Sequence, residues 1–310
     1  MSAPDGKFTT RGIHEFLSRK YPPMEFLLDP ILTRRGTAMI AGFRGRGKSF
    51  LALSVAYAIA TGARLLNWHA PNPTSVLYVD AEMDPADVQQ RIAAIHETLG
   101  PSARCQPTDE SFRILSAQEH AFGIPDLADP TDNSGRRRIE AALGDCEVLF
   151  LDNLSTLCRT GVENDAESWG AMQEWLLHLR SHGKSVVILH HAGKEDKRGR
   201  ATQRGTSKRE DILTASLMLQ KHGDAGFKVE CTKLRSGRVF DPFPVALDYI
   251  AGKRCVLSIG QSDEQMNAEM AAFLKAQGHS QKDIAKRIGV DQSTVSRWLA
   301  RHISREAGRA

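Results

Sequence analysis

The sequence predicts an α/β fold: a mostly parallel β-sheet with helices on both faces, antiparallel strands at one edge, and a small all-α domain near the C-terminus. Three observations predict it. Short apolar runs alternate with helical patterns from Thr37 to about Thr214, as in a covered parallel sheet. Closely spaced strand-like runs then follow without helices between them, and the residues after 264 carry helical patterns separated by turns.

The chain has 310 residues, 41% of them hydrophobic, and a net charge of only +4, so we expect one large and one small domain and no global basic field. Five widely spaced cysteines without a C-x-x-C pair argue against a disulfide framework or a zinc site. The longest apolar run, Phe50 to Ala60, is far shorter than the roughly 20 residues of a membrane span. We expect a cytoplasmic protein with no membrane partner.

We predict three parts: an N-terminal arm at 1–36, an α/β core at 37–257 and a small helical domain at 264–302, with a linker at 258–265. The arm has a short amphipathic segment that ends at Tyr21-Pro22-Pro23. Predicted core strands are 38–41, 75–80, 112–115, 146–152 and 185–191, and predicted helices are 48–61, 85–99, 134–143 and 165–182. Three edge runs follow: ASLMLQK, GFKVECTKL and RVFDPFPVALDYI.

The stretch from Gly42 to Ser49 is a G-x-x-x-x-G-K-S phosphate loop, placed between a strand pattern and a helix pattern. Its backbone N–H groups and Lys48 would hold the phosphates of ATP, and Ser49 would ligate Mg²⁺. The alternative is an ordinary glycine-rich turn. The predicted cofactor-binding residues here are Gly42, Arg44, Gly45, Arg46, Gly47, Lys48, Ser49 and Phe50.

A second part of the predicted nucleotide site is the run VLFLD, which ends at Asp152. A buried strand of this kind delivers a carboxylate to the Mg²⁺ shell. The pattern is weak alone, and it becomes informative because it follows a phosphate loop. We therefore predict Ser49 and Asp152 as the metal ligands.

Glu82 follows the strand-like run SVLYVD. With the phosphate loop, this Asp-Ala-Glu resembles the RecA-like ATPases, and within them the hexameric RepA-type and DnaB-type replicative helicases. The resemblance covers most of residues 25–255, and it implies that Glu82 orients the attacking water as a general base. The alternative is an acid that stabilises the N-terminus of the helix begun by Asp84-Pro85.

The pair His190-His191 ends the run SVVILHH, and RepA-type helicases show a similar His-His-Ala before a basic loop. Because successive strand residues face opposite sides, only one of the pair can face the γ-phosphate. The resemblance implies that His191 is this sensor. A hydrogen-bonded histidine at a strand end is the other interpretation.

Lys233-Leu-Arg235-Ser-Gly237 resembles the Lys-x-Arg-x-Gly motif of DnaB-type helicases, whose lysine and arginine reach the nucleotide of a neighbouring subunit. The resemblance implies catalytic roles for Lys233 and Arg235 in trans, and hence a homo-oligomer, a hexamer in that group. The chain departs from the plasmid RepA pattern, because Thr214 stands where that group has its arginine finger. A solvated turn between two strands is the competing interpretation.

Two parts of the chain are candidates for DNA contact. The run at 193–211 is rich in basic residues and glycine, which suits tracking of a single strand, although charge runs are often only solvated. Its predicted contacts are Lys194, Lys197, Arg198, Arg200 and Arg204.

The second candidate, GHSQKDIAKRIGVDQSTVSRWLARH, resembles the helix-turn-helix of resolvases and sigma factors, with a preceding helical pattern at 266–277. Its second helix would enter the major groove of duplex DNA. A protein-binding helical tail is the alternative. The predicted contacts are Gln292, Ser293, Thr294, Ser296 and Arg297.

These features favour a ring-forming, RepA-like ATPase and DNA helicase of a plasmid, phage or other mobile element. One rival is a DNA-binding regulator that uses ATP occupancy as a switch without unwinding. Another is a filament-forming mediator of recombination or transposition.

Overall fold

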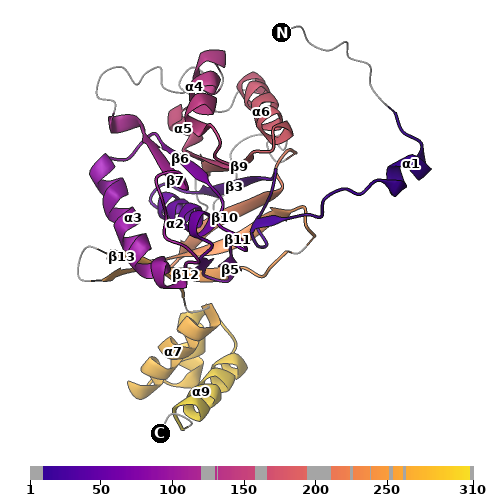
Figure 1. Ribbon diagram of the computed structural model, residues 1–310. Helices are drawn as coiled ribbons and strands as arrows, with labels where there is room; N and C mark the ends of the chain where they lie inside the picture. The colour runs from indigo at the N-terminus through magenta and orange to yellow at the C-terminus, as the bar shows by residue number, and fades with distance from the viewer. Residues whose placement is uncertain are drawn as a thin grey trace.

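The computed structural model describes residues 10–119, 130, 132–157, 166–193, 211–223, 226–237, 239–250, 254–260 and 263–307. Its centre is a nine-stranded sheet in the order β13-β12-β11-β10-β3-β9-β8-β6-β7 (Figure 1). Helices cover both faces of this sheet, and a separate helical unit follows its last strand. The predicted fold class is confirmed: an α/β core with a mostly parallel sheet and antiparallel edge strands, and a small helical domain.

The parallel part of the sheet runs from β10 to β7. It contains β10 (Ala215–His222), β3 (Thr37–Gly42), β9 (Ser185–His191), β8 (Val148–Asp152), β6 (Val76–Asp80) and β7 (Phe112–Ser116). Gly42 is in register with His191, and Asp80 is in register with Asp152. Because parallel strands end at one edge of a sheet, segments distant in the sequence meet there.

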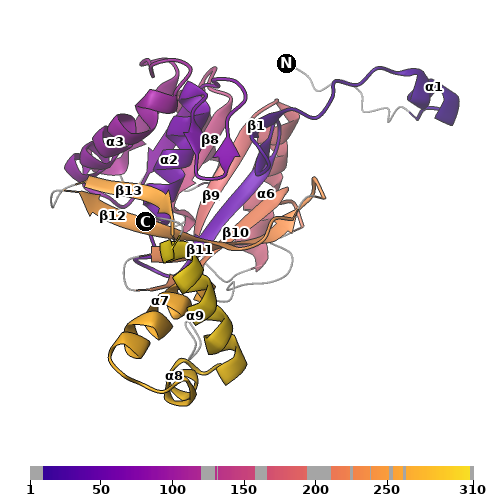
Figure 2. The same ribbon diagram turned by 90° about the horizontal axis from the view of Figure 1, so that it is seen from below.

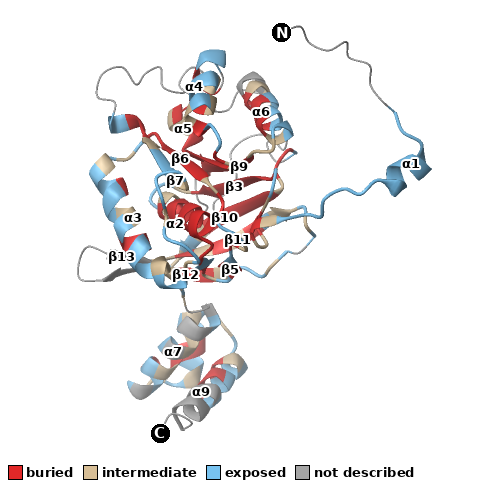
Figure 3. Cartoon of the chain, viewed as in Figure 1, coloured by how far each residue is buried: buried red, intermediate tan, exposed pale blue. Residues whose placement is uncertain are grey.

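Two helical layers enclose the sheet, and each has its own apolar core. One face carries α2 (Lys48–Thr61) and α3 (Pro85–Leu99), and the other carries α4 (Asn133–Leu143), α5 (Leu154–Leu157) and α6 (Ala166–Ser181). Helix α2 is buried on nearly every side (Figure 3), which agrees with the apolar residues on all of its faces. It is thereby held firmly behind the loop that precedes it.

The antiparallel edge consists of β11 (Gly226–Leu234), β12 (Phe243–Ile250) and β13 (Arg254–Ile259). The β12–β13 pair passes beside α3, which contacts β13 (Figure 2). Two details differ from the sequence expectation. Strand β13 was not predicted, and β12 begins only at Phe243, because Phe240 and Phe243 first pack against Trp68.

Smaller elements complete the core. They are the hairpins β1 (Phe26–Leu28) with β2 (Leu32–Thr33) and β4 (Arg64–Leu65) with β5 (Trp68–His69), and the 3₁₀ turns Gly100–Ser102 and Ala117–Glu119. Helix α1 (Ile13–Ser18) has no buried residue and stands away from the core (Figure 1). Within the described residues, no helix is long and apolar enough to cross a membrane.

The C-terminal unit consists of α7 (Asp263–Ala276), α8 (Gln281–Ile288) and α9 (Gln292–Ala307). Ser280 caps α8 by accepting a hydrogen bond from the Asp283 backbone N–H at 3.2 Å. Gly289 ends that helix with a φ of 79°, a conformation that favours glycine. The helices share one apolar core, formed by Ala271, Leu274, Ile284, Ala285, Val295, Trp298 and Leu299.

Candidate functional site

The phosphate loop leaves β3 and enters the N-terminus of α2. Gly45 and Gly47 have φ values of 73° and 78°, which only glycine adopts without strain. A Cβ atom at Gly47 would also lie 3.0 Å from Phe227 and 3.2 Å from Leu247. The sequence therefore folds here into a loop that lets its backbone approach an anion closely at the N-terminus of α2.

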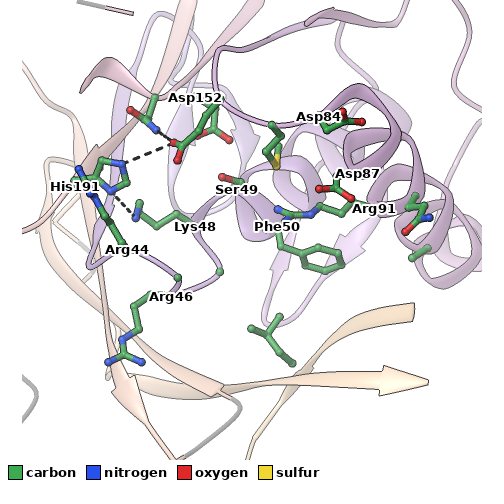
Figure 4. A pocket seen from close by; sticks show the side chains of 18 residues that line it. Arg44, Arg46, Lys48, Ser49, Phe50, Asp84, Asp87, Arg91, Asp152 and His191 are labelled. Carbon is green, nitrogen blue, oxygen red and sulfur yellow. Dashed lines mark hydrogen bonds and ion pairs between the residues drawn. The ribbon is translucent and has the colours of Figure 1, made fainter. Parts of the chain in front are cut away.

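This loop opens into a cavity of about 590 Å³ between α2, α3 and the strand ends (Figure 4). Most predicted nucleotide residues line it: Arg44, Gly45, Arg46, Gly47, Lys48, Ser49, Phe50, Glu82, Asp152 and His191. Gly42 does not line it. It pairs with His191 in the sheet, and a Cβ there would lie 3.0 Å from that of Leu219, so its role is close packing of strands.

Lys48 lies at the inner end of the cavity and is only 6% exposed. Its Nζ donates to the Phe43 carbonyl at 3.0 Å and lies 3.1 Å from Nδ1 of His191. Burial lowers the pKa of Lys48 to about 8, against the opposite influence of the Asp152 and Glu82 carboxylates. The negative charge of a bound triphosphate would stabilise the protonated form of Lys48.

Two buried carboxyl groups lie side by side behind Lys48. Tyr78 donates to Oδ2 of Asp152 at 2.6 Å, and burial raises the pKa of Asp152. Burial, then the neighbouring Asp152, raise the pKa of Asp80 to about 7. Its Oδ1 atom is buried and accepts no hydrogen bond within the described part of the chain.

These groups fit a divalent cation. Ser49 at the N-terminus of α2 and Asp152 at the end of β8 line the same cavity, so both predicted ligands open into one space. Oxygen donors from a hydroxyl and a carboxylate are the ligands Mg²⁺ prefers. The buried carboxyl pair, with one oxygen left without a donor, is a concentration of negative charge that a cation would relieve.

Glu82 and His191 face each other across the cavity mouth. Oε2 of Glu82 lies 3.9 Å from Nε2 of His191, and the Glu82 side chain is 58% exposed. His190 is 2% exposed and lies outside this cavity, as the alternation of side chains along β9 requires. The choice of His191 over His190 therefore agrees with the geometry.

The same cavity continues along α3, in a part that we call the α3 compartment and that sequence reasoning missed. Met83 and Asp84 line it just before the helix. Asp87, Gln90, Arg91 and Ala94 line it from one face of α3, because they lie three or four residues apart. Leu247 of β12 also lines the cavity. The helical spacing was visible in the sequence, but the approach of β12 was not.

Lys233 and Arg235 lie at the other end of the sheet. Register places Leu219 beside Gly42, at the phosphate-loop end, and Leu234 beside Ala215, at the far end. Neither Lys233 nor Arg235 lines the cavity, and Arg235 donates to the Asp211 carbonyl. Neither residue can therefore act on the nucleotide of its own subunit.

The predicted single-strand contacts lie outside the described residues: Lys194, Lys197, Arg198, Arg200 and Arg204. In the C-terminal unit, Gln292, Ser293, Ser296 and Arg297 are exposed at the beginning of α9, and Thr294 is partly buried. Arg297 donates to Thr294 Oγ1 at 3.1 Å. Val295 and Trp298 face inward, so the polar face of α9 is presented to solvent.

Two solved structures resemble the chain. One is the flagellar accessory protein FlaH from Methanocaldococcus jannaschii, with 12% identity, a TM-score of 0.48, and coverage of 73% of this chain and 91% of that one. The other is a KaiC-like protein from Pyrococcus horikoshii, with 16% identity, a TM-score of 0.47, and coverage of 74% and 93%.

Two family models match the chain. Residues 262–309 match a homeodomain-like domain, which agrees with a DNA-binding helix-turn-helix. Residues 7–197, more than half of the chain, match an AAA domain. The chain therefore belongs to this AAA domain family of P-loop ATPases, and it joins that ATPase domain to a helix-turn-helix.

Proposed function

We propose that this protein hydrolyses ATP to drive a ring of subunits along DNA, as a RepA-like replicative helicase of a plasmid, phage or other mobile element. The observation that carries the proposal is the single cavity in which Lys48, Glu82 and His191 meet beside Asp152. A general base, a phosphate-binding lysine and a polar group at the γ-phosphate position are the parts that phosphoryl transfer to water requires.

Each group in the cavity would have its own role in ATP hydrolysis. The loop N–H groups and Lys48 hold the phosphates, and Ser49 and Asp152 hold Mg²⁺. The cation supplies charge neutralisation on the phosphate oxygens. Glu82 orients a water molecule and takes its proton, while His191 contacts the γ-phosphate. The α3 compartment with Leu247 takes the ribose and base, because it continues the cavity beyond the phosphates.

A ring completes the site in trans. Arg235 is exposed and far from its own phosphate loop, which suits an arginine that acts on a neighbour's nucleotide. Its backbone N–H donates to the Thr214 carbonyl at 2.8 Å. Arg235 therefore lies next to the position where the plasmid RepA pattern has its arginine finger, which supports its assignment to that role.

The DNA contacts divide between the two domains. The basic run at 193–211 follows β9 and would track a single strand near the ring axis. The exposed residues of the first two turns of α9, Ser293, Ser296 and Arg297, would bind duplex DNA in the major groove and bring the ring to its site. We propose that the domain boundary lies within the predicted linker at 258–265, between the end of β13 and the beginning of α7. The predicted arm at 1–36 includes the β1–β2 hairpin, whose Leu28 and Leu32 are buried in the core.

Steady-state ATP hydrolysis by wild type and Lys48→Ala, alone and with single-stranded or duplex DNA, tests the proposal. We expect single strands to stimulate the wild type and Lys48→Ala to be inactive. A strand-displacement assay on a forked substrate then tests unwinding. A protein that stays monomeric with ATP and DNA present would contradict the ring.

The exposed polar turn of α9 also supports a second candidate, an ATP-gated DNA-binding regulator. In that case hydrolysis stays slow with single strands, and ATP changes duplex affinity instead. Strand displacement that survives deletion of 264–310 rules the regulator out. Rings in negative-stain images exclude the filament-forming mediator.

A further inference from the structure

Asn153, the residue after Asp152, makes a hydrogen bond that the mechanism above does not use. Its Nδ2 amide donates to Oε2 of Glu82. Asn153 is 2% exposed, whereas the Glu82 side chain is 58% exposed. A buried donor therefore holds a carboxylate that would otherwise sample several rotamers in solvent.

The other end of the same amide is also held. Oδ1 of Asn153 accepts from the backbone N–H of Thr156 at 3.1 Å and from its hydroxyl at 3.2 Å. Both donors belong to α5, the short helix that follows β8. Because two donors occupy the oxygen, the NH₂ group must face Glu82, and the orientation of the amide is determined.

We propose that Asn153 is a positioning residue that keeps the Glu82 carboxylate facing the phosphate loop and ties it to α5. The inference rests on the proposed hydrolysis, in which Glu82 is the base. An amide suits this task because it donates a hydrogen bond without a charge. A lysine or arginine in its place would form an ion pair with Glu82 and weaken it as a base.

Two substitutions separate this role from a structural one. Asn153→Ser and Asn153→Asp keep an oxygen that can accept from Thr156, and both residues are common at helix N-termini. Both lack the NH₂ donor. We expect kcat for ATP to fall by about tenfold to a hundredfold in each, because a displaced base is costly. KM should stay close to that of the wild type in both variants, and so should the melting temperature of Asn153→Ser, which adds no buried charge.

A double-mutant cycle tests whether the effect passes through Glu82. In the Glu82→Gln background, which already lacks the base, Asn153→Ser should cause no further loss of kcat. Thr156→Val is the matched variant on the other side of the amide. It removes only the hydroxyl contact, so we expect a smaller loss of kcat in the same direction.

Unchanged or increased kcat in Asn153→Ser overturns the inference, as does a loss that adds fully to that of Glu82→Gln or that accompanies a lower melting temperature. A wild type without ATP hydrolysis overturns the proposed function and this inference with it. A wild type that hydrolyses ATP, together with variants that are equally fast, overturns this inference alone.

Discussion

The Nζ atom of Lys48 lies 3.1 Å from Nδ1 of His191, and the opposite ring nitrogen of that histidine faces Glu82. Because a lysine ammonium can only donate, Nδ1 is the acceptor and the ring proton of a neutral His191 lies on Nε2, towards the carboxylate. His191 therefore lies between Lys48 and Glu82, within hydrogen-bonding distance of the lysine and farther from the carboxylate.

The pKa of about 8 for Lys48 predicts pH-dependent nucleotide binding. The free protein loses this charge as the pH rises through 8, whereas the bound triphosphate requires it. We expect the affinity for ATP to fall by about tenfold between pH 7 and pH 9, because binding must first restore the proton. Isothermal titration across this range measures the slope.

Lys48→Arg is the control, because arginine keeps its charge throughout the range. Its affinity should be weaker than that of the wild type but constant with pH. If the ATP affinity of both proteins changed equally with pH, the titrating group would be a residue other than Lys48.

Asp80 predicts a pH-dependent stability. A carboxyl group whose pKa is raised to about 7 in the fold reduces stability as the pH rises from about 4 to 7. Asp80→Asn should therefore stabilise the Mg²⁺-free protein at pH 8, by roughly 2 to 4 kcal/mol, and have little effect at pH 4. The amide keeps an oxygen to accept from Met83, which donates at 3.1 Å. Chemical denaturation at both pH values measures this.

Asp145→Asn, at an exposed position, is the matched control and should change stability little at either pH. Destabilisation of Asp80→Asn at pH 8 would mean that its carboxylate has a favourable partner in the fold.

The α3 compartment predicts that substitutions in it weaken the binding of ATP but not that of a ligand without a nucleoside. Arg91→Ala and Leu247→Ala should weaken ATP binding by about tenfold and leave the binding of inorganic tripolyphosphate unchanged, since that ligand has no ribose or base. Lys48→Ala should weaken both. Competition against a fluorescent ATP analogue measures the affinities. If both ligands lost affinity equally, the ribose and base of ATP would not bind in the α3 compartment.

The place of Arg235 predicts complementation between subunits. Lys48→Ala and Arg235→Ala should each be inactive alone, but mixed rings should recover part of the ATPase activity. A neighbour that carries Lys48→Ala can still supply Arg235 to an intact phosphate loop. Activity is measured against the mixing ratio. A mixture no more active than its components, despite subunit exchange, would exclude an arginine in trans.

The exposed polar face at the beginning of α9 predicts that two arginine substitutions differ in their effect on DNA binding. Arg297→Ala should weaken duplex binding by about tenfold or more, whereas Arg287→Ala, an equal loss of charge on α8, should have a much smaller effect. Fluorescence anisotropy with a duplex selected from a random pool measures both. Equal losses would indicate general electrostatic attraction instead of groove reading by α9.

Much of the nucleotide site could be predicted because its residues sit directly after apolar strands. The phosphate loop follows AMIAG, Asp152 ends VLFLD, and His191 ends SVVILHH. Parallel strands covered by helices end at one edge, so these positions were expected to meet. Asn153 adjoins one of them, but nothing in the sequence indicates that its amide would reach Glu82.

The edge of the sheet was less predictable. Strand β13 and the late beginning of β12 depend on pairing with β11 and on packing of Phe240 and Phe243 against Trp68, which are contacts between distant segments. The same pairing of β12 with β11 brings Leu247 to the wall of the cavity. Antiparallel edge strands are specified by such non-local contacts more than by local pattern.

The sequence by itself determined the chemical parts of this protein: a loop that only glycines can form, carboxylates and histidines at strand ends, and a capped pair of helices with a glycine turn. These features follow from backbone geometry and periodicity, which act over a few residues. Only the tertiary structure decided that His191 lies between Lys48 and Glu82, that the Asn153 amide donates to that carboxylate, and that Arg235 lies away from its own nucleotide cavity. Those relationships depend on strand order and register, which are set by packing between segments far apart in the chain.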